Sequence, residues 1–169
     1  TVILIQALVV VRPPTPEVTE FWEKHCRPDD GYSNYTIRAV IENGTPEALT
    51  FFEKNLQDPR HEDDRNAWLL FDVLAHRNDL PLLKSIERLL ASPLEPSLRL
   101  LLVDVLFDYK PDDWYGPHLI PVPPLRAQAS RDALLQLRRV GEKALGLTGL
   151  TQAQREQIVK VFEEIRPRL

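Results

Sequence analysis

The feature that most constrains the fold of this chain is a repetition of physical character at an offset of 34 residues. Apolar positions of one segment recur as apolar positions of the next, and helix breakers recur as helix breakers. Periods of about 20 to 50 residues are typical of stacked supersecondary units, in which each unit buries its apolar face only against its neighbours. The matching pairs are Ile37 with Phe71, Val40 with Leu74, Leu49 with Leu83, Phe52 with Ile86, Leu56 with Leu90, and Pro59 with Pro93.

Start and stop signals divide the chain into helices joined by short turns. Thr15 and Thr45 are each followed by Pro and Glu, which combines a capping side chain, a proline at the first helical position and an acid in the first turn. Gly44 suits the left-handed conformation that closes a helix, and Thr151 with Gln154 forms a capping box. We predict helices over 16–25, 34–43, 46 to at least 56, 65–77, 80–91, 97–109, 126–145 and 152–166.

Length and composition fit one soluble globular domain. The chain has 169 residues, of which 43% are hydrophobic and 27% charged. Its 15 prolines and six glycines are typical of helices separated by proline-containing turns. The single cysteine, Cys26, excludes an intrachain disulfide framework. We therefore predict an all-α fold of antiparallel helix pairs stacked as a short solenoid, with residues 15–169 as one domain and residues 1–14 as an apolar N-terminal segment.

Residues 2–11 form a run that is apolar except for Gln6. Ten residues are too few to span a bilayer as a helix, which takes about 20. Three interpretations stay open for this run: an element packed on the first repeat, the end of a membrane anchor that begins upstream, or the core of a signal peptide. They leave the location of the chain open between the cytoplasm and a membrane.

The repeat pattern resembles HEAT-type α-solenoid repeats. The likeness lies in the turn Asp58-Pro59, in Arg65 near the start of a first helix, and in Asp79 within the intra-repeat turn. It covers residues 34–109 and implies an α-α superhelix that binds other macromolecules along an extended surface. Tetratricopeptide repeats share the 34-residue period and are the weaker alternative, because Asp72 stands where that family has a small residue.

A proline-rich insertion at residues 110–125 interrupts the repeat plan. Long loops inside compact domains are uncommon and tend to be functional. Prolines lower the entropy lost on ordering, and Trp and Tyr are enriched at binding hot spots. The insertion either covers the end of the third helix pair or projects as a contact epitope. The candidate partner-binding residues are Asp112, Asp113, Trp114, Tyr115 and His118.

Cations gather near the end of a chain whose net charge is −4. Residues 126–169 hold nine Lys/Arg against five Asp/Glu, whereas residues 1–125 hold 12 against 20. A candidate basic face follows helical spacing and consists of Arg131, Arg138, Arg139 and Lys143. The first interpretation of this face is a solvated surface. An acidic protein partner or anionic lipid headgroups come next, and nucleic acid comes last.

Local clusters of catalytic or metal-ligating residues do not stand out in the sequence. No two of the four histidines lie three or four residues apart, and there is no phosphate-binding loop or nucleophile elbow. We therefore expect no catalytic residue, cofactor or metal. The predicted function is a non-catalytic protein–protein interaction module, an adapter or accessory subunit of a larger assembly that is either free or membrane-associated.

The resemblance also implies an alternative function, because some HEAT-like proteins are DNA glycosylases with a concave basic groove. Trp68, Asp113 and Trp114 would supply the aromatic and acidic residues of such a site. A sequence pI near 5.6 argues against nucleic acid as the partner, since binding domains of that kind carry a dense basic stripe.

Overall fold

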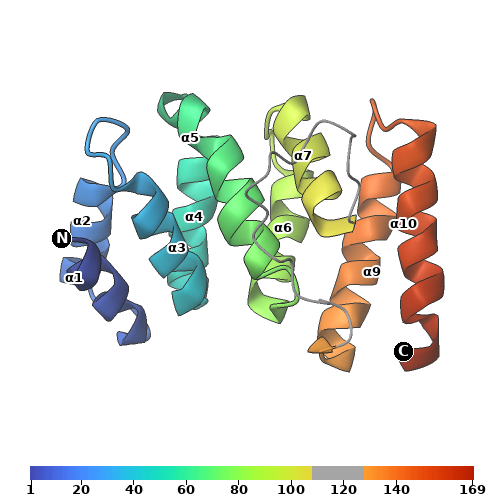
Figure 1. The fold of residues 1–169 in the computed structure, drawn as a ribbon, viewed down its shortest axis with the longest axis horizontal. Coiled ribbons are helices and arrows are strands. Elements are labelled where there is room, and N and C mark those ends of the chain that lie inside the picture. Colours follow the sequence, from blue (N-terminus) through green and yellow to red (C-terminus); the bar gives the residue numbers. More distant parts are fainter. Residues whose placement is uncertain (108–127) are drawn as a thin grey trace, which may run out of the picture. The chain divides into compact units, whose positions relative to one another are not determined.

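The structure is a computed structural model that describes residues 1–107 and 128–169, apart from the side chain of Phe71. Within these ranges the chain consists of helices and turns and contains no strand, which confirms the predicted all-α class (Figure 1). Its contacts divide it into two compact units, Thr1–His76 and Arg77–Leu169. The stacking of helix pairs into a solenoid stays a prediction.

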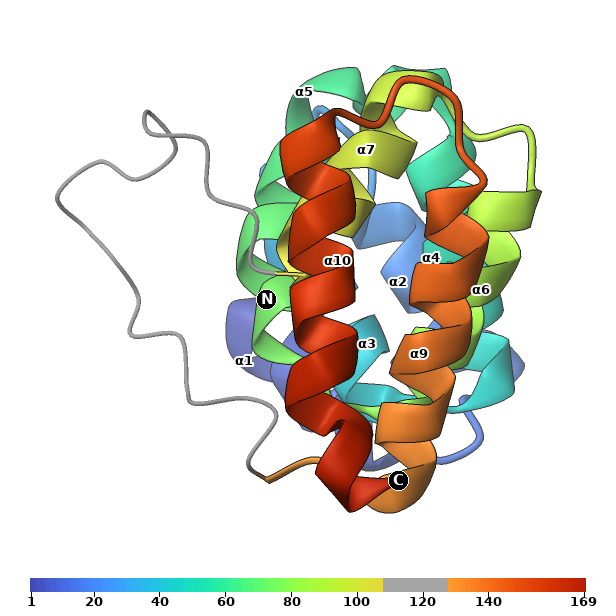
Figure 2. The same cartoon turned by 90° about the vertical axis from the view of Figure 1, so that its right-hand side faces the viewer.

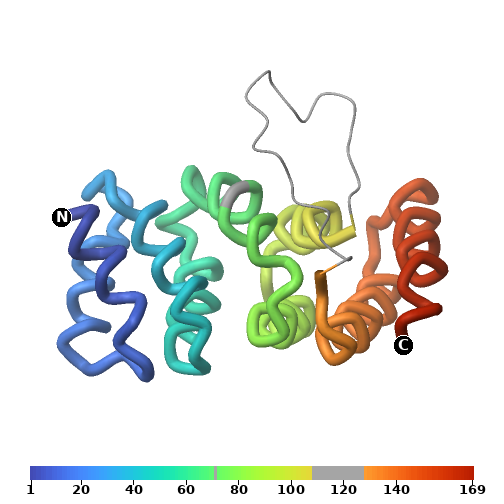
Figure 3. The backbone as a smooth tube through the Cα atoms, turned by 60° about the horizontal axis from the view of Figure 1, so that its bottom comes forward, coloured from blue at the N-terminus to red at the C-terminus, as the bar shows by residue number. Residues whose placement is uncertain are grey.

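Unit 1 is built around one central helix, α3, which packs against α1, η1, α2, α4, α5 and η3 (Figures 1 and 3). Ile37, Val40 and Ile41 of this helix are each at most 2% exposed. The elements of the unit are α1 (Val2–Ala7), the 3-10 turn η1 (Leu8–Val10), α2 (Pro16–His25), α3 (Ser33–Asn43), α4 (Pro46–Gln57), the 3-10 turn η2 (Pro59–His61), α5 (Glu62–Ala67) and the π-helical segment η3 (Trp68–Val73).

Local capping signals set the ends of α2, α3 and α4 as predicted. The hydroxyl of Thr15 accepts a hydrogen bond from the backbone N–H of Val18, and that of Thr45 accepts one from Ala48, both at 3.4 Å. Gly44 closes α3 with a φ of 68°, in the left-handed region. These caps confirm that the start and stop signals of the sequence act locally in unit 1.

The apolar N-terminal run packs on α3 as a short helix followed by a 3-10 turn. Ile5 is fully buried, and the side-chain amide of Asn43 donates to the carbonyls of Val9 and Val11, both at 2.9 Å. Ile3 remains 87% exposed. None of the helices in the described ranges combines the length and the apolar character that crossing a bilayer requires. A membrane anchor stays a prediction.

The helix predicted over 65–77 differs from the observed one in both start and geometry. The helical turns begin at Pro59, where the Asp58 carboxylate accepts from the backbone N–H of Arg60 at 3.0 Å. Three acids then fill the first turn of α5, where they are favourable next to the positive end of the helix dipole. From Trp68 to Val73 the helix widens into a π-helical segment, which the sequence pattern did not predict.

In the part of unit 2 that the structure describes, four helices each pack against two others. Helix α6 contacts α7 and α9, and α10 contacts the same two helices; Figure 2 shows α9 and α10 side by side. The capping box of α10 is confirmed, because the N–H of Thr151 donates to the side chain of Gln154 at 2.9 Å and the N–H of Gln154 donates back at 3.2 Å. The elements are α6 (Leu80–Ala91), α7 (Pro96–Phe107), α9 (Arg131–Leu145), α10 (Gln152–Ile165) and the 3-10 turn η4 (Arg166–Arg168).

Helix α9 begins at Arg131 and not at residue 126 as predicted. The hydroxyl of Ser130 accepts from the backbone N–H of Ala133 at 3.1 Å, so serine supplies an N-cap that the prediction overlooked. Helix α7 begins at Pro96, one residue before its predicted start. Its predicted end at residue 109 and the insertion at 110–125 lie outside the described residues.

The offset of 34 residues corresponds to equivalent buried positions in helices α4 and α6. Each member of three matched pairs is at most 3% exposed. The two helices therefore bury apolar residues at positions that are equivalent under the offset of 34 residues. The three pairs are Leu49 with Leu83, Phe52 with Ile86, and Leu56 with Leu90.

We expect Gly141→Ala to destabilise the protein by about 1 kcal/mol. A Cβ at this position would lie 2.5 Å from Phe162 and 3.0 Å from Phe107, which is fully buried. Overpacking of this kind costs about 1–3 kcal/mol and exceeds the gain of roughly 0.5–1 kcal/mol from replacing a helical glycine. Urea unfolding measures the change, with Gly146→Ala as the control because its added Cβ has its nearest contact at 3.4 Å. Equal midpoints for the two variants would contradict the packing.

Candidate functional site

The strongest candidate site is a hollow of about 260 Å³ in unit 1, where α3 meets η3. Its lining combines an aromatic ring, an amide, a guanidinium and a carboxylate, and so offers both apolar and charged contacts. The lining residues are Asn34, Tyr35, Arg38, Ala67 and Asp72. We call this set the α3 contact site.

An ion pair between a buried acid and a partly exposed base forms the centre of the α3 contact site. Arg38 Nε donates to Asp72 Oδ1 at 3.0 Å. The side chain of Asp72 is 3% exposed, whereas that of Arg38 is 45% exposed. The buried carboxylate therefore fixes the orientation of a guanidinium that still reaches solvent.

Helical spacing explains why polar residues of α3 line the hollow. Asn34, Tyr35 and Arg38 are exposed, while the apolar positions between and beyond them face the core of unit 1. Neighbouring elements hold the first turn of this helix in place. The Gln6 side chain donates to the Tyr35 carbonyl at 3.2 Å, and the Ser33 hydroxyl donates to the carboxylate of Asp64 in α5 at 3.0 Å.

The π-helical segment η3 carries Asp72 into this site. Trp68, Leu69 and Val73 of the same segment are fully buried, so η3 is packed firmly in unit 1. Single π-helical turns inside α-helices are frequently found at functional sites. The irregular turn and the buried charge therefore coincide at the same place in the chain.

Burial sets the protonation behaviour of Asp72. It raises the pKa of this carboxyl group to about 6, against the hydrogen bond and charge of Arg38 and the charge of His76, which favour the ionised form. The nearby charge of Glu42 raises it further. A carboxyl group whose pKa is shifted by burial and by a specific partner, and which lines a hollow, marks a candidate functional site.

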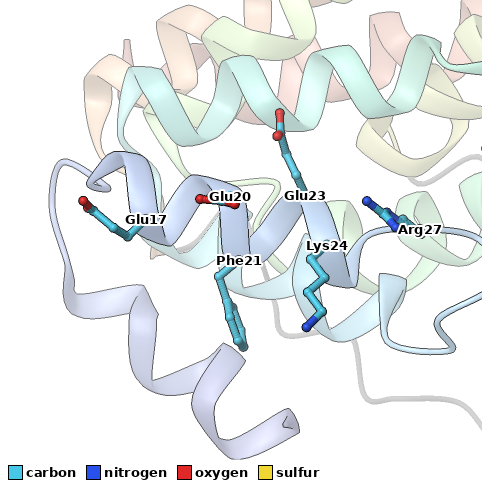
Figure 4. Close-up of a pocket in the computed structure, with 6 residues that line it drawn as sticks. All are labelled: Glu17, Glu20, Phe21, Glu23, Lys24 and Arg27. Atoms are coloured by element: carbon cyan, nitrogen blue, oxygen red, sulfur yellow. The ribbon is translucent and has the colours of Figure 1, made fainter.

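Two other hollows in unit 1 are less suited to chemistry. One of about 570 Å³ lies along α2 and the residues that follow it, so one stretch of chain supplies its whole lining (Figure 4). The other, of about 260 Å³, contains Cys26 and His61, which are 1% and 3% exposed. Burial raises the pKa of the Cys26 thiol to about 12, so the thiol is not a nucleophile at neutral pH.

The predicted basic face is exposed on α9 but partly neutralised. Arg138 pairs with Glu142 at 3.0 Å, and Lys143 pairs with Glu87 of α6 at 3.5 Å.

The predicted epitope residues lie outside the described residues, as do two of the three residues named for the glycosylase alternative. The third, Trp68, is fully buried, so its ring is not a surface for stacking. The five epitope residues are Asp112, Asp113, Trp114, Tyr115 and His118.

Neither Arg38 nor Asp72 was a candidate in the sequence analysis. The available signal was an acid inside the apolar run from residue 68 to 74, at the place where tetratricopeptide repeats have a small residue. The two residues are also 34 apart, which is the repeat offset. Within the described ranges, no group of three or more His, Cys, Asp or Glu side chains is arranged to hold a metal ion.

No family model, curated protein or solved structure matches this chain. The HEAT-type resemblance therefore rests on the sequence pattern, and it stays a prediction.

Asp72→Asn should remove a pH-dependent loss of stability. Because the folded pKa of Asp72 is raised to about 6, its contribution to stability is fully present below the ordinary pKa of an aspartate and is lost as the pH rises through 6. A rise of about 2 in pKa corresponds to a change of roughly 3 kcal/mol in the free energy of unfolding. The stability of Asp72→Asn relative to the original protein should therefore increase by up to about this amount between pH 4 and pH 7.

Urea unfolding at a series of pH values measures this difference. Burial also raises the pKa of Asp104 in unit 2 to about 6, but this effect is present in both proteins and cancels in the comparison. A difference between the two proteins that does not change with pH would show that Asp72 titrates normally.

Proposed function

We propose that this chain is a non-catalytic protein–protein interaction module, an adapter or accessory subunit built from HEAT-like helix pairs. In this proposal the α3 contact site binds a protein partner. The observation that carries the proposal is the exposed guanidinium of Arg38, held by the buried Asp72 and placed next to the exposed ring of Tyr35.

Pre-organisation of Arg38 favours a binding role. Ordering a flexible side chain at an interface costs about 0.5–1.5 kcal/mol, and a side chain that is already held in place avoids part of this cost. Arg and Tyr are among the residue types that dominate binding hot spots. The guanidinium of Arg38 is anchored at 3.0 Å, and Tyr35 is 43% exposed one helical turn away. Together they offer an anchored charged contact beside an exposed aromatic one.

The size of the hollow favours a partner's side chain over a small-molecule substrate. Pockets that enclose small ligands typically measure about 300–1,000 Å³. The α3 contact site measures about 260 Å³ and would accommodate a single anchoring side chain. Most of the contact with a partner would then lie on the surface around the hollow.

Structural contacts engage two side chains of unit 1, His25 and Cys26, that could otherwise perform chemistry. His25 Nδ1 pairs with Asp30 at 2.5 Å, and the ring of His25 lies against Phe21 with 4.5 Å between the centroids. Burial keeps the thiol of Cys26 protonated at neutral pH. These contacts support a structural role for both residues. The glycosylase alternative stays a prediction. The complete burial of Trp68 does not favour it, because a buried ring cannot stack on a base.

The equivalent buried stripes of α4 and α6 support the HEAT-like part of the proposal. In repeat proteins, each helix pair contacts its neighbours through the same apolar positions, and the remaining surface is free for partners. Matched pairs such as Leu49 with Leu83 follow this scheme.

Photo-crosslinking tests the proposal. A photoreactive phenylalanine in place of Tyr35 should capture a protein partner from an extract of the native source, and mass spectrometry would identify that partner. The affinity of the purified partner is then measured for Tyr35→Ala and Arg38→Gln. Glutamine at 38 can still donate a hydrogen bond to Asp72, so this variant removes the guanidinium without leaving the buried acid unpaired.

We expect each substitution to weaken binding at least tenfold, which corresponds to about 1.4 kcal/mol. The matched control is Thr50→Ala on α4, an exposed position away from the hollow, and it should bind like the original protein. Equal affinities for all three variants would exclude the α3 contact site. Turnover of a defined small substrate by the purified chain would contradict the non-catalytic role.

A further inference from the structure

The two units carry opposite net charges. Residues 1–76 contain seven Lys/Arg and 13 Asp/Glu, a net charge of −6, whereas residues 77–169 contain 14 and 12, a net charge of +2. A chain that is acidic in one part and basic in another attracts unlike parts of other copies through its field. Which surfaces can meet depends on where unpaired charges are exposed.

Two exposed cations of unit 2 flank an exposed apolar side chain on α9. Leu135 is 39% exposed and lies four residues from both Arg131 and Arg139, which places all three on one side of the helix. Both arginines are exposed and have no ion pair among the described residues, whereas the other two cations of the basic face pair with nearby acids. We call the group of Arg131, Leu135 and Arg139 the basic patch.

The adjoining surface of α6 cancels only part of this charge. Lys84 and Arg88 are exposed on α6, which packs against α9. The acid between them, Glu87, accepts a hydrogen bond from Gln136 at 2.6 Å and pairs with Lys143. The carboxylate of Glu87 also interacts with the charge of Arg139, so it offsets part of the positive potential of the basic patch.

Three of the 13 acids of unit 1 lie on α2 and line the hollow of about 570 Å³. Glu17 and Glu20 lie toward the N-terminal end of this helix, and Lys24 lies toward its C-terminal end (Figure 4). The hydrogen bond from Thr15 lowers the pKa of Glu17, which is therefore ionised at neutral pH. Glu17 and Glu20 have no ion pair among the described residues, and the half-buried Phe21 adds an apolar part to the lining. We call Glu17, Glu20 and Phe21 the acidic patch.

We propose that this chain associates with further copies of itself through contact of the basic patch of one copy with the acidic patch of another. The basic patch presents a leucine flanked by arginines, and it matches the end of the hollow where Glu17 and Glu20 lie beside Phe21. Lys24 and Arg27 line the other end of the hollow and stay outside this contact. Complementary charges speed encounter and select the register, and burial of Leu135 against Phe21 would add apolar contact. Because unlike patches meet, each copy keeps one patch open, so the association either extends or closes into a ring.

Sedimentation equilibrium at two salt concentrations tests the proposal. The Debye length is about 30 Å at 0.01 M and about 3 Å at 1 M ionic strength, so salt should abolish a contact made by exposed charges. We expect the weight-average mass to rise with protein concentration at low salt and to fall to that of the monomer at high salt. Monomeric behaviour at low salt would overturn the proposal, even if the protein bound vesicles of anionic lipid or an acidic protein.

Charge-reversal variants locate the contact. Arg131→Glu with Arg139→Glu makes both patches acidic, and Glu17→Lys with Glu20→Lys makes both basic. Each double variant should remain monomeric alone, and an equimolar mixture of the two should associate, because their patches are again complementary. Circular dichroism would confirm that each variant retains its helix content.

The control is Lys160→Glu with Arg166→Glu, which alters the net charge as much as the first double variant but lies at exposed positions on α10 and η4. It should associate like the original protein. Loss of association in this control, or association of either reversed variant alone, would assign the effect to overall charge or to another surface. The proposal is independent of the α3 contact site and does not require Arg38.

Discussion

The burial of α3 is the constraint on which the rest of unit 1 depends. This helix packs against six other elements, and its apolar residues are almost completely removed from water. Burying one such side chain contributes about 1.5–3 kcal/mol, so a polar substitution at Ile37 or Val40 would remove a large part of the stability of a small unit. Only one stripe of α3 is left for other uses, and this stripe carries Tyr35 and Arg38.

The pair of Arg38 and Asp72 is difficult to explain by stability alone. Removing a carboxylate from water is costly, and the raised pKa of Asp72 shows that the guanidinium does not fully offset this cost. An apolar residue at position 72 would suit the packed π-helical segment at least as well. Features that reduce stability without a structural benefit are expected at functional sites, where they pre-organise a contact.

Local signals in the sequence predict much of the fold. Thr15, Thr45 and Thr151 mark helix starts, and Gly44 marks a helix end, because capping depends on a few neighbouring residues. The π-helical segment and the Arg38–Asp72 contact depend on residues distant in the sequence. The 34-residue period relates these two positions, but it does not indicate that side chains so far apart would pair across two elements. For the same reason the candidate site predicted from the sequence lies in the proline-rich insertion, where aromatic and acidic residues are adjacent along the chain.

Direct titration of Asp72 is the measurement that tests this account most closely. The chemical shift of its carboxyl carbon, followed by NMR from pH 3 to pH 8, reports the pKa of this one group. We predict a midpoint near 6, with a change in the Arg38 Nε–H signal over the same pH range, because the two groups share a hydrogen bond. A midpoint near the ordinary value of about 3.9, with no response from Arg38, would show that Asp72 is solvated and does not hold the guanidinium in place.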